Sequence, residues 1–177
     1  MKEEDKTIVA TVGIDDSFQV FRLADGSLAN IRIMDTSGQD KFDSLTSSFY
    51  KNADCCLLVY DITSKESFEK IKTYYIKKIK ENRDKIVKVV LLGNKKDLEE
   101  NRKVPIEDGI KLAEENEFIF MESSCYSNHN IVDAFTTLIE MTNSELIKIK
   151  RENNNIRLEI NKKPIDKDDG KSQSCRC

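Results

Sequence analysis

The chain has 177 residues, five cysteines and a formal net charge of −3. This length suits one domain with a substantial core, and the lack of a basic excess argues against nucleic acid as a partner. No apolar run approaches the roughly 18 residues of a membrane span, residues 1–6 are too polar for a signal peptide, and cysteines inside an apolar run indicate reduced thiols in the cytosol.

The first part of the chain predicts a β-hairpin that ends in a polar turn. Residues 17–23 and 28–34 alternate between apolar and polar types, and Asp25-Gly26 marks a tight turn between them. The second strand leads into the segment 35–40, DTSGQD. A carboxylate at a strand end, a glycine that allows close approach and a glutamine that can orient a water suit a metal-bound phosphate. On this segment alone, an ordinary polar turn is the alternative.

The middle of the chain predicts an amphipathic segment, a buried strand and a helix. Residues 41–51 carry aromatic and apolar residues at helical spacing, which fits either core packing or a surface for partners. An apolar strand is expected at 54–61. Ser64 can cap the following helix. Its expected inward face consists of Phe68, Ile71, Tyr75 and Ile79.

The next apolar strand after 54–61 is expected at 87–92. It leads into Gly93-Asn94-Lys95-Lys96-Asp97, which fits the pattern N-K-x-D. The aspartate of this pattern can accept hydrogen bonds from the N1–H and the 2-amino group of guanine, a pair of donors that adenine lacks. Another short strand, 118–121, precedes Glu122-Ser123-Ser124. Loops at the carboxyl ends of several strands predict a nucleotide crevice in a doubly wound sheet.

The last third predicts two helices and a polar tail. Pro105 stands at a helix start, and Ile110 and Ala113 are its expected inward residues. The final helix is expected to run from about 130 to 150. Beyond Arg151 few apolar residues remain, so we expect a domain over 1–150 and a disordered tail over 151–177.

Together these motifs resemble the Ras superfamily of small GTPases, and within it the Rab family most closely, from about 11 to 149. Residues 11–15 look like the family's T-I-G-V-D, 35–42 like D-T-A-G-Q-E-R-F and 58–63 like L-V-Y-D-V-T. The resemblance implies an α/β fold of the P-loop NTPase (Ras-like) type, with a doubly wound, mostly parallel sheet.

The resemblance also implies a guanine-nucleotide-dependent switch in vesicle trafficking, which binds GTP or GDP with Mg²⁺ and hydrolyses GTP slowly unless helped. On the family pattern, Thr11 and Asp35 would hold the magnesium, Gly38 would contact the terminal phosphate and Gln39 would orient the attacking water. The residues that would bind the guanine base are Asn94, Lys95, Asp97, Ser124 and Cys125. At the last of these loops the family has S-A-K where this chain has Ser124-Cys125-Tyr126.

The chain ends in Cys175-Arg176-Cys177, an ending that in the Rab family carries two geranylgeranyl groups. Two lipids anchor a protein stably, whereas one binds a membrane only marginally. The resemblance therefore implies a monomer on the cytoplasmic face of an intracellular or plasma membrane, with a cytosolic pool. Its expected partners are exchange factors, GTPase activators, effectors and prenylation escort factors.

One family motif is not found before Thr11, namely the phosphate loop G-x-x-x-x-G-K-[ST]. Gly170-Lys171-Ser172 completes only its second half, because Ile165 stands where the first glycine belongs. We therefore expect the family's first strand, phosphate loop and first helix to be lacking, through either a start placed too late or a truncated relative. The base-reading loop and Gln39 favour the first explanation. The second leads to an alternative function, a nucleotide-free prenylated interaction module, or pseudo-GTPase, that binds trafficking partners.

Overall fold

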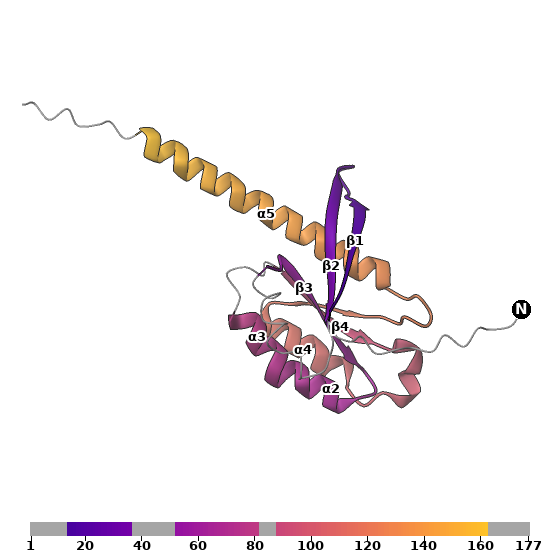
Figure 1. The fold of residues 1–177 in the computed structure, drawn as a ribbon. Helices are drawn as coiled ribbons and strands as arrows, with labels where there is room; N and C mark the ends of the chain where they lie inside the picture. Colours follow the sequence, from indigo (N-terminus) through magenta and orange to yellow (C-terminus); the bar gives the residue numbers. More distant parts are fainter. Residues whose placement is uncertain (1–13, 37–51, 82–87, 163–177) are drawn as a thin grey trace, which may run out of the picture.

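The computed structural model describes residues 14–36, 52–81 and 88–162, which form two separate sheets and their covering helices (Figure 1). Strands β1 (Ile14–Arg22) and β2 (Leu28–Thr36) make an antiparallel hairpin. Strands β3 (Cys55–Asp61), β4 (Lys88–Asn94) and β5 (Ile119–Glu122) make a parallel sheet in the order β3-β4-β5. Parallel strands joined through helices confirm the predicted α/β class.

The hairpin follows the predicted pattern. Its register pairs Ile14 with Thr36 at the open end and Arg22 with Leu28 next to the turn. The N–H of Leu23 donates to the carbonyl of Ser27 at 2.9 Å, and Gly26 has a φ of 84°, a left-handed conformation that glycine adopts without a steric penalty. The Asp-Gly turn is therefore confirmed.

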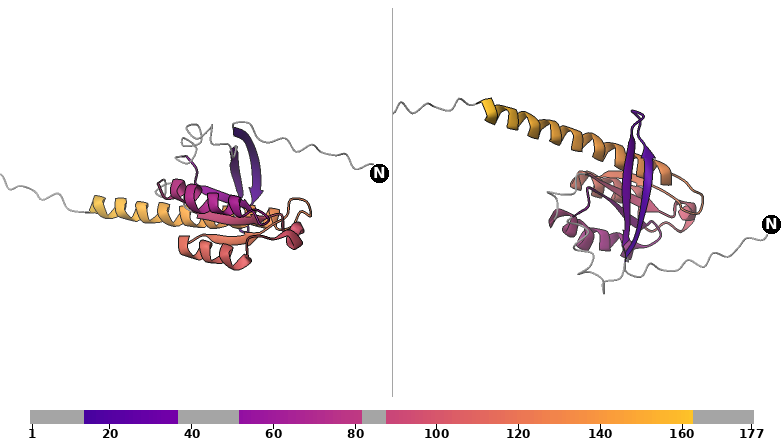
Figure 2. Two further views of the ribbon diagram at one scale, coloured as in Figure 1. Left: turned by 90° about the horizontal axis from the view of Figure 1, so that it is seen from below. Right: turned by 45° about the horizontal axis from the view of Figure 1, so that its top comes forward.

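The helical layers cover both faces of the three-stranded sheet (Figures 1 and 2). Helix α2 (Lys65–Lys70), the π-helical segment η2 (Ile71–Tyr75) and α3 (Ile76–Glu81) follow one another without a break. Ser64 caps α2 as predicted, since its hydroxyl accepts a hydrogen bond from the N–H of Ser67. Helix α4 (Ile106–Asn116) begins directly after Pro105, and α5 (Ile131–Lys162) is the longest helix in the described ranges.

The largest apolar core lies on the face of the sheet that α2, η2, α3 and α4 cover. Tyr60 and Leu91 contribute from the strands, while Phe68, Ile71 and Ala113 contribute from the helices. Val90 and Leu92, which point to the opposite face by strand alternation, are also buried, and α5 contacts β3 and β4 there. Strand β4 is therefore covered on both faces, which explains its continuous apolar sequence.

The inward face of α4 was predicted wrongly at one position. Ile110 is 39% exposed, whereas Gly109, Leu112 and Ala113 are buried. Helical spacing places Gly109, Leu112 and Ala113 on one stripe and Ile110 beside it. The side that faces the sheet includes the glycine because the sheet approaches α4 closely there.

The final helix also runs past the predicted end at about residue 150. Helix α5 continues to Lys162. No glycine or proline interrupts residues 131–162, so nothing in the local sequence forces an earlier end.

The hairpin and the parallel sheet share no strand pairing within the described ranges. Strand β2 pairs only with β1, and β3 pairs only with β4. The resemblance places the family's first strand between these two edges. The turn of the hairpin is connected to α5 by a hydrogen bond of 3.1 Å from the N–H of Ala24 to the carboxylate of Glu140. None of the helices described in these ranges is long and apolar enough to cross a lipid bilayer.

Substituting Gly109 tests the close packing of α4. A Cβ at this position would lie 2.5 Å from Phe120 Cε2 and 2.6 Å from the hydroxyl of Tyr60. At an exposed helix position, Gly→Ala would stabilise the protein by about 0.5–1 kcal/mol. A destabilising effect at Gly109 would therefore show that the Cβ has no room. We expect Gly109→Ala to lower the free energy of unfolding by about 1–3 kcal/mol in urea denaturation. The exposed Lys111→Ala is the control, and a stabilised Gly109→Ala protein would contradict the packing.

Substituting Tyr60 tests a buried hydroxyl. Tyr60 is 2% exposed, and its hydroxyl has no hydrogen-bond partner in the described part of the chain. Burial, with a smaller effect of the Glu122 carboxylate, raises the pKa of Tyr60 to about 12. Since the unfolded tyrosine ionises near pH 10, this side chain lowers the stability of the fold as pH rises from about 10 to about 12.

We expect Tyr60→Phe to unfold at an unchanged or higher urea concentration at neutral pH, because an unpaired buried hydroxyl is removed. Its stability advantage over the parent protein should grow between about pH 9 and about pH 11. Tyr126→Phe is the matched control, since Tyr126 is 89% exposed. An advantage that is constant across this pH range would show that Tyr60 titrates normally.

Candidate functional site

The carboxyl ends of the three parallel strands lie side by side. Asp61 at the end of β3 is opposite Asn94 at the end of β4, and Gly93 is opposite Glu122 at the end of β5. Backbone hydrogen bonds continue beyond the strands. The N–H of Ser123 donates to Gly93 at 2.8 Å, and the N–H of Lys96 donates to Ser123 at 3.0 Å. The loops that were predicted to meet at this edge are therefore joined.

The predicted base-reading residues lie close together at this edge. The buried hydroxyl of Ser124 donates to the carboxylate of Asp97 and accepts the N–H of Ser127 at 3.0 Å. The side-chain amide of Asn94 lies 3.6 Å from the sulfur of Cys125. Asp97 and Cys125 are exposed. A buried serine thus orients an exposed carboxylate next to an amide, an arrangement that can bind a planar polar ring.

Lys95 connects this group to the end of β3. Its backbone has a φ of 69° and a ψ of 38°, a left-handed conformation that is costly for a lysine and that persists only where the surroundings hold it. Its ammonium lies 2.7 Å from a carboxylate oxygen of Asp61. Burial raises the pKa of Asp61, but hydrogen bonds from Lys95 and Thr63 outweigh that effect and hold the pKa below its ordinary value.

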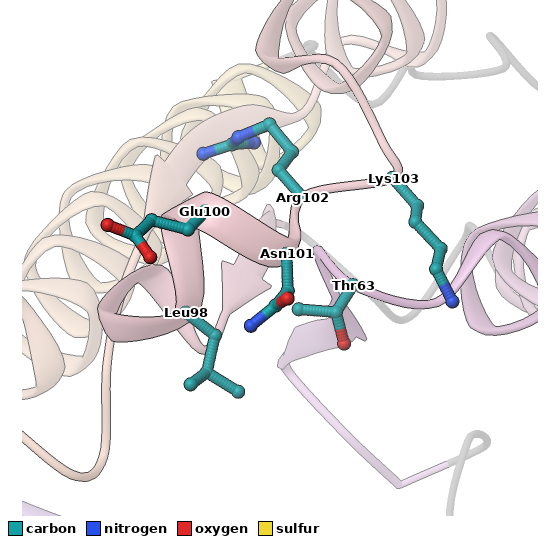
Figure 3. Close-up of a pocket in the computed structure, with 6 residues that line it drawn as sticks. All are labelled: Thr63, Leu98, Glu100, Asn101, Arg102 and Lys103. Carbon is teal, nitrogen blue, oxygen red and sulfur yellow. The ribbon is translucent and has the colours of Figure 1, made fainter.

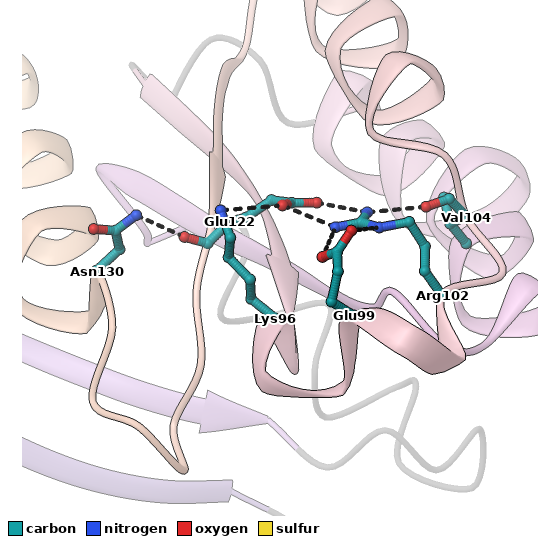
Figure 4. Close-up of polar contacts among 6 residues, drawn as sticks. All are labelled: Lys96, Glu99, Arg102, Val104, Glu122 and Asn130. Carbon is teal, nitrogen blue, oxygen red and sulfur yellow. Dashed lines mark hydrogen bonds and ion pairs between the residues drawn. The ribbon is translucent and has the colours of Figure 1, made fainter.

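A second polar group lies under the same loops and is centred on Arg102 (Figure 4). Arg102 follows η3 (Lys96–Asn101), the short 3-10 helix that includes Asp97. Its guanidinium donates to both carboxylate oxygens of Glu122, at 2.7 and 3.0 Å, and to both of Glu99, at 2.7 and 2.6 Å. The hydrogen bonds to Glu99 and Glu122 raise the pKa of Arg102 above its ordinary value.

The comparison with known families and proteins agrees with this geometry. The Ras family model matches residues 2–144. The chain belongs to the Ras family. Rab-13 of Canis lupus familiaris is 41% identical over 132 residues, which are 75% of this chain and 64% of that protein. Rab-8A of Pongo abelii is 39% identical over 132 residues, 75% of this chain and 63% of that protein.

A third relative is the GTP-binding protein ypt2 of Schizosaccharomyces pombe, which is 34% identical over 149 residues, 84% of this chain and 74% of that protein. These relatives place this Ras-family chain in the Rab group. Its match spans 64% of the length of the Rab-13 relative.

The remaining predicted residues of this Ras-family chain are Asp35, in the hairpin, and several that lie outside the described ranges. Asp35 is exposed near the end of β2, opposite Asp15 in β1. The predicted residues that lie outside the described ranges, like the amphipathic segment 41–51, are Thr11, Gly38, Gln39, Cys175 and Cys177.

Asp35 suits the magnesium that the Ras family implies. Its carboxylate is a hard oxygen ligand, which Mg²⁺ prefers, and Mg²⁺ is commonly held by one or two protein groups together with phosphate oxygens and water. Within the described residues, no group of three or more metal-binding side chains is assembled.

Sequence reasoning missed three residues of the site. Asp61 could have been found, because it ends β3 just as Asn94 ends the neighbouring β4. No sequence pattern predicts the ion pair of Arg102 and Glu122, since it depends on how η3 packs against β5. A surface hollow beside η3 was also not foreseen; it is lined by Thr63, Leu98, Glu100, Asn101, Arg102 and Lys103 (Figure 3).

Substituting Ser124 tests the connection between the two base-reading loops. Ser124→Ala removes the donor to Asp97 and the acceptor for the N–H of Ser127. We expect the free energy of unfolding to fall by about 1–2 kcal/mol in urea denaturation, because that N–H loses its partner. Ser127→Ala, which changes only an exposed side chain, is the control. Equal stability of the two variants would mean that the Ser124 hydroxyl does not hold these groups.

Proposed function

We propose that this protein is a Rab-like small GTPase, a guanine-nucleotide-dependent switch in intracellular vesicle trafficking. The observation that carries the proposal is the hydrogen bond from buried Ser124 to exposed Asp97, which orients a carboxylate at the carboxyl edge of the sheet. Its Rab relatives support the same function.

In this proposal the guanine base binds beside Asp97. The carboxylate accepts hydrogen bonds from the N1–H and the 2-amino group of guanine, while the hydroxyl of Ser124 holds it in place. Asn94 supplies an amide beside the base, and Cys125 contributes through its backbone. The stem of Lys95 packs against the ring while its ammonium stays with Asp61, a contact that fits the 2.7 Å ion pair.

The phosphates would be bound by Asp35 in the hairpin and by residues that precede and follow the hairpin in sequence. Magnesium, when bound, would neutralise charge on the phosphates of GTP or GDP. Thr11 and Asp35 are the residues that would hold it, and Gly38 would donate its amide to the terminal phosphate. Gln39 would orient the water that attacks this phosphate, so that GTP hydrolysis is slow unless an activator assists.

Attachment to a membrane would come from the C-terminus. Prenyl groups on Cys175 and Cys177 would anchor the monomer to the cytoplasmic face of an intracellular or plasma membrane, in exchange with a cytosolic pool. Exchange factors, GTPase activators, effectors and prenylation escort factors are the partners of this cycle. The Rab-13 and Rab-8A relatives support regulators and effectors as partners in general, whereas the lipid anchor is proposed from the Cys-x-Cys ending.

A second candidate function is a nucleotide-free prenylated interaction module. It is favoured by one observation: the printed sequence has no complete G-x-x-x-x-G-K-[ST] motif, because Ile165 replaces the first glycine of the nearest match. A protein without the backbone amides of that loop would lack the main binding site for the phosphates. The two candidates differ in whether the protein carries nucleotide.

The deciding experiment measures nucleotide content and base selectivity. The purified full chain is heated and the released nucleotide is identified by chromatography. The affinities for GDP and xanthosine diphosphate are then compared in the parent and in Asp97→Asn. We expect bound guanine nucleotide in the parent, and a loss of GDP affinity of at least about tenfold in Asp97→Asn, because an amide cannot accept both donors of guanine. In Asp97→Asn the affinity for xanthosine diphosphate should rise. Xanthine has a 2-carbonyl where guanine has a 2-amino group, and the asparagine amide can donate a hydrogen bond to it.

Glu100→Gln is the matched control, because it neutralises an exposed acid in the same short helix. An unchanged ratio of the two affinities in Asp97→Asn would contradict the role of Asp97. A folded parent protein that carries and binds no guanine nucleotide would support the interaction module.

A further inference from the structure

We propose that Arg102 is a positioning residue, which fixes the loop that contains Asp97 against the loop that contains Ser124. Arg102 does not belong to the proposed base-reading group. The consequence of this positioning for base selectivity rests on the proposed function, whereas the positioning itself does not.

The contacts of Arg102 join two segments that are far apart in sequence. Its guanidinium forms a two-pronged ion pair with Glu122, the last residue of β5, and another with Glu99 in η3 (Figure 4). A nitrogen of the same group also donates to the carbonyl of Val104 at 3.1 Å. A planar guanidinium that is held at two carboxylates has a fixed orientation, which a lysine ammonium would not provide.

Burial makes the pair of Arg102 and Glu122 difficult to replace with water. The side chain of Glu122 is 4% exposed and that of Arg102 is 16% exposed. Glu122 has further partners that hold it in place. The ammonium of Lys96 lies 3.7 Å from its carboxylate, and the side-chain amide of Asn130 donates to its carbonyl at 2.9 Å. A carboxylate this buried would be unstable if its principal cation were removed.

The position of these residues in the chain connects the pair to the site. Glu122 immediately precedes Ser123 and Ser124, and Arg102 immediately follows the helix η3 that contains Asp97. The start of η3 is held by the hydrogen bond from the N–H of Lys96 to Ser123 and by the contact of Ser124 with Asp97. Its end is held by Arg102. The short helix is therefore fixed to the β5 loop at both ends.

Removing the contacts of Arg102 at the end of η3 should also weaken the contacts of Ser123 and Ser124 at its start. The helix η3 has only 3-10 geometry, and at Leu98 a φ of −101° and a ψ of 34° interrupt it, so its own hydrogen bonds are a weak constraint. Without Arg102, Asp97 can move relative to Ser124. A displacement of a fraction of an ångström is enough to weaken a directional pair of hydrogen bonds.

The first measurement is amide hydrogen exchange in the full chain, which does not require bound nucleotide. In Arg102→Met we expect the amides of Lys96 and Ser123 to exchange at least about tenfold faster, through local opening of the loop. The amides of Val90 and Leu91, in the centre of β4, should be unaffected. Unchanged exchange at Lys96 and Ser123 would overturn the proposal.

A second variant separates positioning from the cost of an unpaired charge. In Arg102→Met with Glu122→Met, both charges are removed, so we expect the urea midpoint to return toward that of the parent. Exchange at Lys96 and Ser123 should nevertheless stay fast, because the connection is still absent. If the double variant restores slow exchange together with stability, Arg102 only compensates a buried charge and the proposal is overturned. This variant also decides the matter if Arg102→Met alone does not fold.

Two conservative variants define the geometry that is needed. Arg102→Lys keeps the positive charge but loses the planar guanidinium fork, which donates to both oxygens of a carboxylate. The amide hydrogens of Lys96 and Ser123 should therefore exchange faster in this variant than in the parent. Glu99→Gln leaves the pair with Glu122 intact and should exchange as the parent does, because Glu99 is exposed. Slow exchange in Arg102→Lys would show that charge alone suffices and would overturn the proposed role of the fork.

The last measurement links the positioning to the proposed function. The ratio of GDP to inosine diphosphate affinity reports the contact with the 2-amino group, which inosine lacks. We expect this ratio to fall at least about fivefold in the double variant relative to the parent, and an unchanged ratio would contradict the link to base selectivity. If the parent binds neither nucleotide, the proposed function fails, while hydrogen exchange still decides whether Arg102 positions the loops.

Discussion

The parallel pairing of β4 with β3 on one side and β5 on the other is the constraint on which the rest of the structure depends. Because both neighbours run in the same direction, Asp61, Asn94 and Glu122 end at one edge of the sheet. The apolar residues of β4 hold this arrangement, since they are buried on both faces and separating β4 from its neighbours would expose them to water. Burial far from the site therefore determines which polar residues meet there.

The polar contacts at this edge join the loops at several points. Backbone hydrogen bonds connect residues 93, 96 and 123, and side-chain contacts add Ser124 with Asp97 and Lys95 with Asp61. These contacts are also what holds Lys95 in a left-handed conformation. The cost of that conformation is tolerated because several neighbours determine it together, which is the usual situation at a binding site.

Local sequence was sufficient wherever a feature depends on neighbouring residues. The Asp-Gly turn, the Ser64 cap and the helix start at Pro105 were all predicted, because each follows from the conformations open to a few residues. The exposure of Ile110, the length of α5 and the pairing of Arg102 with Glu122 were not. Ile110 has a neighbour, Gly109, that allows the sheet to approach, and the ion pair depends on packing between η3 and β5. The exposure of Ile110 and this ion pair arise from contacts distant in sequence, which no periodicity reports. The length of α5 instead agrees with a local sequence that contains no glycine or proline over 131–162.

The two parts of the proposed nucleotide site differ in how firmly they are held. The base-reading loops are fixed to one another by hydrogen bonds and ion pairs, whereas the hairpin, whose open end carries Asp35, has no strand partner in the parallel sheet within the described ranges. Within the described ranges, no sheet hydrogen bond joins β2 to β3. A ligand that contacts both parts would join them itself. Because binding to the folded form adds directly to its stability, a nucleotide bound at the proposed site would stabilise this fold.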